Sequence, residues 1–219
     1  MGSLISLIMG SPSLPVTKNC PVIYITGFSK FWHYSENSSE MAVCILKELN
    51  LEKKLGCKIV FDILNVSYED ASSIIPKKWK ELNPQLVIHI GMKCNTDKLI
   101  LEQVARNSGY EYNDVHRKVP KDKLCIPGGE EEIKSGICME TVSKTINENG
   151  TMKSEKSTNA GWFICEYVYY LSLHQNRFRS AFIHVPPIRD NISASDIAAG
   201  LAAAIEALYH QALDLNNKK

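Results

Sequence analysis

The chain has 219 residues and a formal net charge of +1, a length that suits one α/β domain with a full core. Its composition, 44% hydrophobic and 22% charged residues, is ordinary for a soluble globular protein. The balanced charge argues against a nucleic-acid partner, which normally requires a basic surface. No apolar run approaches the ~20 residues of a membrane span, so we expect no membrane partner either.

Seven cysteines are scattered along the chain, and none forms a C-x-x-C pair. Zinc knuckles and thioredoxin motifs are therefore excluded, and a reduced, cytoplasmic protein is favoured. Because the sequence has no metal-ligand cluster and no glycine-rich phosphate loop, we expect no metal and no cofactor. Residues 1–18 lack the positive region of a signal peptide. We expect them to form a disordered tail before a single domain of residues 19–219, although Gly2 fits the loose pattern for myristoylation.

The first half of the chain alternates apolar strands with helices. A helix is predicted at 37–49, with Met41, Ile45 and Leu49 on one stripe. The capping box Ser67-x-x-Asp70 predicts a second helix that reaches about residue 82, and Pro76 predicts a break or a restart in it. Apolar runs predict strands at 21–26, 58–64 and 85–91.

The second half begins with a less regular region. Residues 94–106 read as a loop that leads into a short helical or extended segment, and the polar, turn-rich residues 107–136 predict surface loops or a small hairpin. Apolar patterns then predict helices at 137–147, 162–174 and from 193 onward, and a strand at 181–185. The last helix opens with the capping box Ser193-x-x-Asp196, and its predicted apolar stripe is Ile197, Leu201, Ile205, Leu208, Ala212 and Leu215. Alternating strands and helices indicate an α/β fold with a mostly parallel sheet covered on both faces.

Cys165 is a candidate nucleophile because it follows a small-residue turn at the start of a helix. Free backbone N–H groups and the helix dipole stabilise a thiolate there, so we expect a depressed thiol pKa. The alternative is that Cys165 is one more buried thiol among seven.

Two histidines compete for the role of general base. His184 and His89 both lie late in apolar strands, where α/β enzymes place catalytic side chains, and the residues alone do not separate them. Glu102 is a candidate for the group that orients the imidazole, because apolar residues flank it. It would otherwise be the exposed side of an amphipathic segment.

Four motifs carry a resemblance to a known family. They are Thr26-Gly-Phe28-x-x-Phe31, Leu101-Glu102 followed by Asn107-x-Gly-Tyr110, Ala160-Gly-x-x-x-Cys165, and Phe182-Ile-His184-Val-Pro-Pro187. From about residue 21 to 215 the chain resembles the pyroglutamyl-peptidase I (pyrrolidone-carboxylate peptidase) family, in particular its animal branch. The resemblance implies a three-layer α/β/α sandwich with a mostly parallel twisted sheet, of the phosphorylase/hydrolase type.

The resemblance also implies an activity and its residues. The family's Glu-Cys-His triad maps onto Glu102, Cys165 and His184, which selects His184 over His89. The implied reaction is hydrolysis of the amide bond after an N-terminal pyroglutamyl residue of small peptides, through an acyl-enzyme. Phe28 and Phe31 would hold the lactam ring, and backbone groups near Val66 would form hydrogen bonds with its N–H and C=O. The oligomeric state stays open.

Two loops depart from the family pattern. Where the family has Thr-Gly-Phe-Gly-Pro-Phe-Gly, this chain has Ser29, Lys30 and Trp32 in place of two glycines and a proline, which predicts strain wherever φ must be positive. After the third strand the chain reads Gly91-Met-Lys-Cys94, without the usual second glycine. The alternative function is therefore a catalytically weak or non-catalytic relative whose reshaped pocket binds peptide N-termini.

Overall fold

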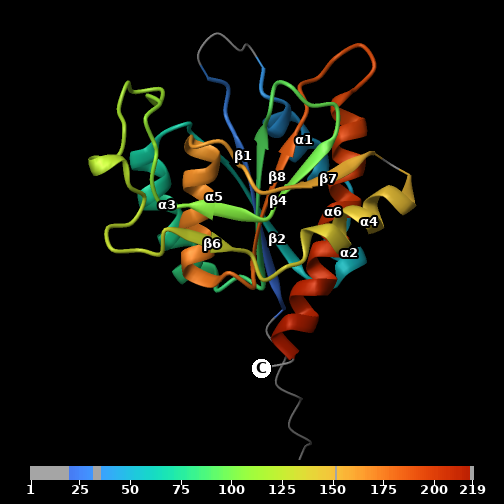
Figure 1. Ribbon diagram of the computed structural model, residues 1–219. Helices are drawn as coiled ribbons and strands as arrows, with labels where there is room; N and C mark the ends of the chain where they lie inside the picture. Colours follow the sequence, from blue (N-terminus) through green and yellow to red (C-terminus); the bar gives the residue numbers. More distant parts are fainter. Residues whose placement is uncertain (1–19, 32–35, 151, 218–219) are drawn as a thin grey trace, which may run out of the picture.

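A computed structural model of the chain describes residues 20–31, 36–150 and 152–217 (Figure 1). The predictions for the tail of residues 1–18, for Gly2 and for Trp32 lie outside the described residues. Within these ranges, no helix combines the length and the apolar character needed to cross a membrane.

A mixed, mostly parallel sheet forms the centre of the molecule. Its order is β2-β1-β3-β8-β4-β7, and all neighbouring strands run parallel except β4, which is antiparallel to β8. This confirms the predicted α/β class. The edge strand β7 was not predicted, because its sequence Ser-Glu-Lys-Ser has no apolar residue. The strands are β1 (Val22–Phe28), β2 (Lys58–Leu64), β3 (Leu86–Met92), β4 (Leu99–Glu102), β7 (Ser154–Ser157) and β8 (Ser180–Val185).

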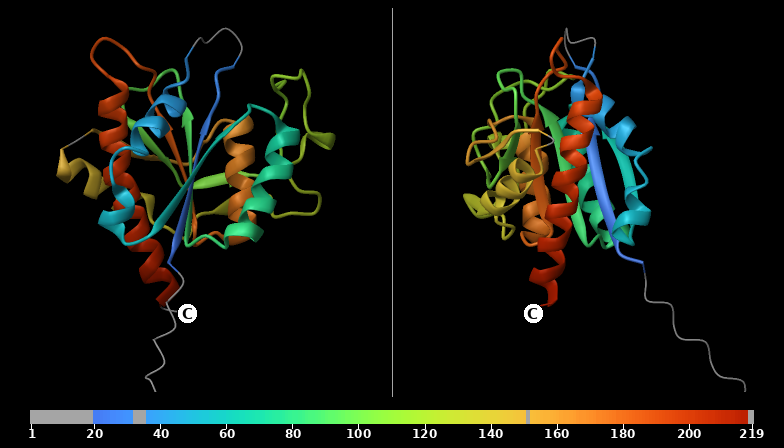
Figure 2. Two further views of the ribbon diagram at one scale, coloured as in Figure 1. Left: turned by 180° about the vertical axis from the view of Figure 1, so that it is seen from behind. Right: turned by 90° about the vertical axis from the view of Figure 1, so that its right-hand side faces the viewer.

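Helices cover both faces of the sheet, which gives the predicted three layers (Figures 1 and 2). On one face, α3 (Tyr68–Leu82) and α5 (Ile164–Asn176) lie side by side over a cluster rich in aromatic side chains. On the other face, α1 (Ser38–Leu46), α4 (Met139–Asn149) and α6 (Ala194–Asn217) cover a mainly aliphatic cluster. The short helix α2 (Leu51–Leu55) follows α1.

The prediction for the first helix was wrong in its end and its buried face. The helix α1 ends at Leu46, and its buried face contains Ala42, Val43 and Leu46, whereas Leu49 is 41% exposed. Close packing explains the choice of face. A Cβ on Gly27 of β1 would lie 3.1 Å from a Val43 methyl group, so the small residues of α1 turn toward the strand.

Pro76 does not interrupt α3, contrary to the prediction. The helix runs from Tyr68 to Leu82, and the hydroxyl of Ser67 accepts the N–H of Asp70 (3.2 Å) as the capping box predicts. Proline removes one backbone hydrogen bond from a helix interior. Ile75 and Trp79 are buried around it, and burial of two large apolar side chains offsets that loss.

The region predicted as surface loops is only partly exposed. A small antiparallel pair, β5 (Val104–Arg106) and β6 (Glu132–Lys134), spans it, with a single 3₁₀ turn at Lys121–Lys123. Asp114 is buried, and its carboxylate accepts the backbone N–H groups of Tyr68, His116 and Lys118 at 3.1, 2.8 and 3.0 Å, which offset the cost of burial. These bonds fix the loop against the start of α3.

Candidate active site

Glu102 and His184 meet because β4 and β8 are neighbours. In the register of these strands, Ile100 lies opposite His184 and Glu102 lies opposite Phe182. The Nδ1–H of His184 donates to Oε1 of Glu102 at 2.8 Å, and both side chains are almost completely buried. Burial lowers the pKa of His184, although the bond to Glu102 acts in the opposite direction. The imidazole is therefore neutral, and Nε2 has no hydrogen-bond partner among the described residues.

Cys165 is the second residue of α5, and its thiol lies against β3. A Cβ added to Gly91 would be 2.8 Å from the Sγ of Cys165, so only glycine leaves room for the thiol there. In the register of β3 and β8, Gly91 is the partner of His184. The thiol of Cys165 therefore lies at the same position along the sheet as the imidazole of His184. No hydrogen bond joins the two side chains in the described part of the chain. Catalytic hydrogen bonds often tighten only when substrate binds.

The predicted low pKa of the thiol is wrong. Burial raises the pKa of Cys165 to about 12, and the negative charge of Glu102 adds to this effect. The backbone N–H at the helix start and the charge of Lys93 lower the pKa, as expected, but they do not overcome burial. Cys165 is consequently a protonated thiol at neutral pH and needs a base to become a nucleophile.

His89 is excluded as that base by its hydrogen bonds. Its Nδ1 is 2.7 Å from the hydroxyl of Thr26, and its Nε2 is 2.7 Å from the hydroxyl of Ser172. Trp79 donates its indole N–H to the same serine at 3.0 Å. Burial lowers the pKa of His89 to about 3. It is therefore a neutral core histidine with both nitrogens occupied.

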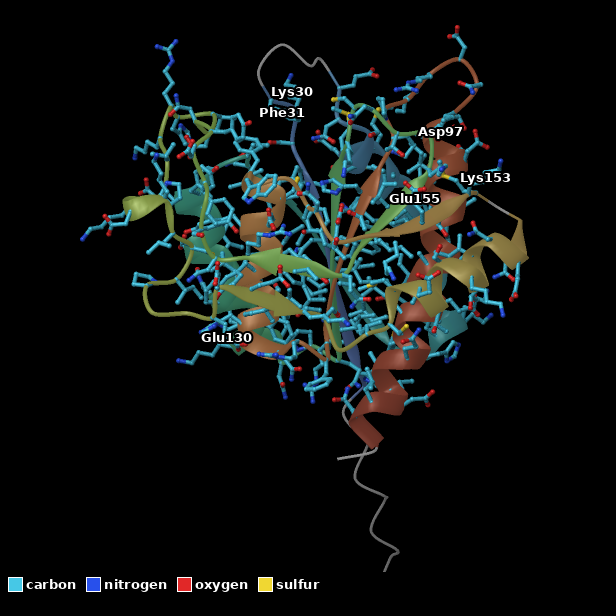
Figure 3. All side chains as sticks on the ribbon, in the orientation of Figure 1. Lys30, Phe31, Asp97, Glu130, Lys153 and Glu155 are labelled. Atoms are coloured by element: carbon cyan, nitrogen blue, oxygen red, sulfur yellow. The ribbon has the colours of Figure 1, made fainter. Side chains whose placement is uncertain are left out.

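The predicted substrate-binding residues lie on the same face as Cys165. Phe28 and Val66 are buried in the aromatic cluster beneath α3 and α5, and Phe31 and Cys165 pack against that cluster. Figure 3 shows Phe31 beyond the end of β1. The carbonyl of Val66 accepts the N–H of Val115 at 3.1 Å, so one of its two lone pairs is in use.

The strain expected in the loop after β1 is absent from its described residues. Neither Ser29 nor Lys30 has a positive φ. The N–H of Ser29 donates to Leu64 at 2.9 Å, and the side chain of Asn37 donates to the carbonyl of Ser29 at 3.1 Å. The first bond continues the pairing of β1 with β2 by one residue and the second ties the loop to the start of α1, and the backbone at 29 and 30 does so without a left-handed residue.

A buried carboxylate supports the turn before Cys165, and the sequence analysis missed it. Glu166 accepts the backbone N–H of Trp162 at 2.6 Å, and it accepts both the backbone N–H and the guanidinium of Arg106 at 3.1 and 3.3 Å. These bonds hold Trp162 at φ 48°. The only signal in the sequence was an acidic residue directly after the candidate nucleophile.

Lys93 is a second residue that the sequence analysis did not place in the site. Its Nζ lies 3.6 Å from Oε1 of Glu102 and 3.5 Å from the carbonyl of Asn159. Its position directly after a buried strand was the available signal. In the described ranges, no group of three or more His, Cys, Asp or Glu side chains is arranged to hold a metal ion.

Comparisons with known proteins identify one family and one fold. Residues 22–211 match the family model described as pyroglutamyl peptidase. The chain is 36% identical to pyroglutamyl-peptidase 1 of Mus musculus over 84% of this chain and 88% of that protein. It is 28% identical to the pyrrolidone-carboxylate peptidase of Pyrococcus furiosus over 78% and 83%. The structure of pyrrolidone carboxyl peptidase from Thermococcus litoralis superposes with a TM-score of 0.78 at 21% identity, covering 90% of this chain and 96% of that one.

Proposed function

The chain belongs to the pyroglutamyl peptidase family and is a cysteine peptidase, and on this premise we propose that it removes an N-terminal pyroglutamyl residue from peptides through Cys165, His184 and Glu102. The observation that carries the proposal is the 2.8 Å bond from the neutral His184 to the buried Glu102, beside a thiol packed on Gly91. Substrates are small peptides whose first residue is pyroglutamate.

The charges of the site define the first step. With Nδ1–H bound to Glu102, the free Nε2 of His184 takes the proton from the thiol of Cys165 as the thiolate attacks the carbonyl carbon of the pyroglutamyl group. Glu102 stabilises the imidazolium that forms. The carbonyl oxygen becomes an oxyanion, and the backbone N–H groups at the start of α5 would donate hydrogen bonds to it.

The second half of the reaction returns the proton. The Nε2–H of His184 protonates the leaving amine as the C–N bond breaks, which leaves a thioester between Cys165 and the pyroglutamyl group. Water then gives a proton to His184 and attacks the thioester, and the tetrahedral adduct collapses to free pyroglutamate and the thiol. In each half of the reaction His184 acts first as a base in its neutral form and then as an acid in its protonated form, which donates to the leaving amine in the first half and to the thiolate of Cys165 in the second.

The flat lactam ring would be held by the aromatic cluster next to Cys165. Phe31 is only partly buried and would border the pocket, whereas Phe28 is 2% exposed and would form its floor. A site that hydrogen-bonds the lactam from the backbone near Val66 would reject analogues that lack the matching groups by about 10⁴-fold or more.

A fluorogenic pyroglutamyl amide tests the proposal. Wild-type protein should release the fluorophore, and it should not cleave the matching prolyl amide, which lacks the lactam carbonyl. Cys165→Ser should lower kcat by about 10⁴-fold or more, because a serine hydroxyl is a far weaker nucleophile in this site. Cys138→Ser is the matched control, since this exposed cysteine lies outside the site.

Two outcomes would overturn the proposal. Turnover that survives in Cys165→Ser would exclude Cys165 as the nucleophile. The second outcome is that folded wild-type protein binds a pyroglutamyl peptide in calorimetry but does not cleave it. That result would support the alternative function, a protein that binds peptide N-termini without catalysis.

A further inference from the structure

Lys93 has a fixed place at the triad. It follows the last residue of β3, Met92, and its backbone N–H donates to the carbonyl of Val185 at 2.9 Å, directly after His184. From there the side chain reaches Glu102 (3.6 Å) and the carbonyl of Asn159 (3.5 Å), with 34% of its surface exposed. One lysine therefore connects β3, the buried carboxylate on β4 and the turn that leads to Cys165.

The charges around Glu102 show why this contact matters. The side chain of Glu102 is fully buried, and its second oxygen, Oε2, has no hydrogen-bond partner in the described residues. His184 is neutral at rest, so its bond does not balance a negative charge. Among the described residues, Lys93 is the only lysine or arginine that forms an ion pair with Glu102 (Nζ to Oε1). Burying a carboxylate without such a partner is costly.

We propose that Lys93 is a positioning residue of the active site, which balances the charge of Glu102, ties the turn at Asn159 to the triad and stabilises the thiolate of Cys165. The proposal deepens the proposed function and rests on it. It does not follow from the family motifs, because Lys93 stands in the loop where this chain departs from them.

The direction in which the loss of Lys93 should shift the pKa values of Cys165 and His184 follows from the charges that face these two groups. Glu102 and Glu166 raise the pKa of Cys165, and Lys93 lowers it. His184 faces the same Glu102 and Lys93, and Lys93 lowers its pKa as well. Removal of the positive charge should therefore raise the pKa of both groups. The thiol would need a higher pH to ionise, and the imidazole would stay protonated to a higher pH.

The test is the rate at which iodoacetamide alkylates Cys165 as a function of pH, measured by peptide mass spectrometry in the absence of substrate. Lys93→Met should move the profile to higher pH by about half a unit or more, given a unit charge at a partly exposed site. Lys93→Gln should move it equally, because glutamine keeps a donor for Asn159 but has no charge. Lys93→Arg should restore the wild-type profile.

Lys98→Met is the matched control. Lys98 lies in the same loop, also carries one positive charge, and pairs with Glu155 at 2.9 Å on the surface, so its loss should leave the profile unchanged. A cooperative thermal unfolding transition in each variant would show that the variants are folded. The acidic limb of kcat/KM should shift upward in Lys93→Met together with the alkylation profile.

The proposal fails if Lys93→Met and Lys93→Gln give the wild-type alkylation profile, or if Lys98→Met shifts it as far as they do. Because alkylation needs no turnover, these results are independent of the peptidase assay. A protein without peptidase activity in which Lys93→Met still shifts the profile would contradict the proposed function and support the role of Lys93.

Discussion

Two buried histidines on neighbouring strands of one sheet have different hydrogen-bond partners in this molecule. His89 on β3 and His184 on β8 both have a lowered pKa, and burial is the main cause for each. His89 contacts the hydroxyls of Thr26 and Ser172, one at each nitrogen. The Nδ1 of His184 is bonded to Glu102, and its Nε2 has no hydrogen-bond partner within the described residues. The thiol of Cys165 lies against Gly91, the residue paired with His184 on the neighbouring strand.

The comparison shows that burial alone does not make a histidine a catalytic base. Burial makes both imidazoles neutral, which is necessary for a base, but only a free nitrogen can accept a proton. The partner also matters, because a carboxylate stabilises the imidazolium after proton transfer, whereas the neutral hydroxyls around His89 do not. We therefore propose that His89 contributes to the stability of the fold and that His184 contributes to catalysis.

Exchange of each imidazole for an amide gives the largest expected effect. His184→Gln should lower kcat/KM by about 1,000-fold or more, because glutamine cannot accept the thiol proton. His89→Gln should instead lower the free energy of unfolding by about 1–3 kcal/mol, through imperfect hydrogen bonds to Thr26 and Ser172, while the folded protein stays active. Kinetics with a pyroglutamyl amide and urea unfolding measure the two effects. A His89 variant that is stable but inactive would reverse the assignment.

The pH dependence of stability gives a smaller effect that belongs to His89. In the unfolded chain its imidazole takes up a proton near the ordinary pKa of about 6.5, whereas in the folded protein it does so only near pKa 3. The unfolded state therefore binds more protons between these values, and stability falls as the pH falls through this window. His184 contributes in the same direction, since its pKa is also lowered.

Urea unfolding of wild type and His89→Gln at about pH 7.5 and about pH 4.5 isolates this contribution, because His184 is present in both proteins. The free energy of unfolding of the wild type should fall by about 3 kcal/mol more than that of the variant over this range. Equal losses in the two proteins would show that His89 titrates normally in the folded state, and the assignment of a buried, neutral imidazole would be wrong.

Much of this arrangement could be predicted from the sequence, for reasons that are local. The apolar runs at 58–64 and 85–91 are strands because parallel strands buried on both faces need such runs. The capping boxes at Ser67 and Ser193 begin helices in the structure. The stripe of the last helix is buried from Ile197 to Ala212.

The remainder depends on contacts between distant segments. No local pattern shows that β4 pairs antiparallel with β8, which is what places Glu102 beside His184. The hydrogen-bond partners of His89 come from β1 and α5, so they could not be predicted from the residues next to it in the sequence either. The thiol pKa was mispredicted because the helix-start effect is local and readable, whereas the burial that outweighs it is not. Pro76 was misjudged for the same reason, since tertiary packing maintains its helix.

The most direct test of the central claim is labelling with a pyroglutamyl chloromethyl ketone, which carries the acyl group to the nucleophile and alkylates it. Peptide mapping should find the label on Cys165 alone, and the labelling rate should fall sharply in His184→Gln and stay near wild type in His89→Gln. A label on any other cysteine, or equal rates in the two histidine variants, would contradict the assignment of Cys165 and His184 as nucleophile and base.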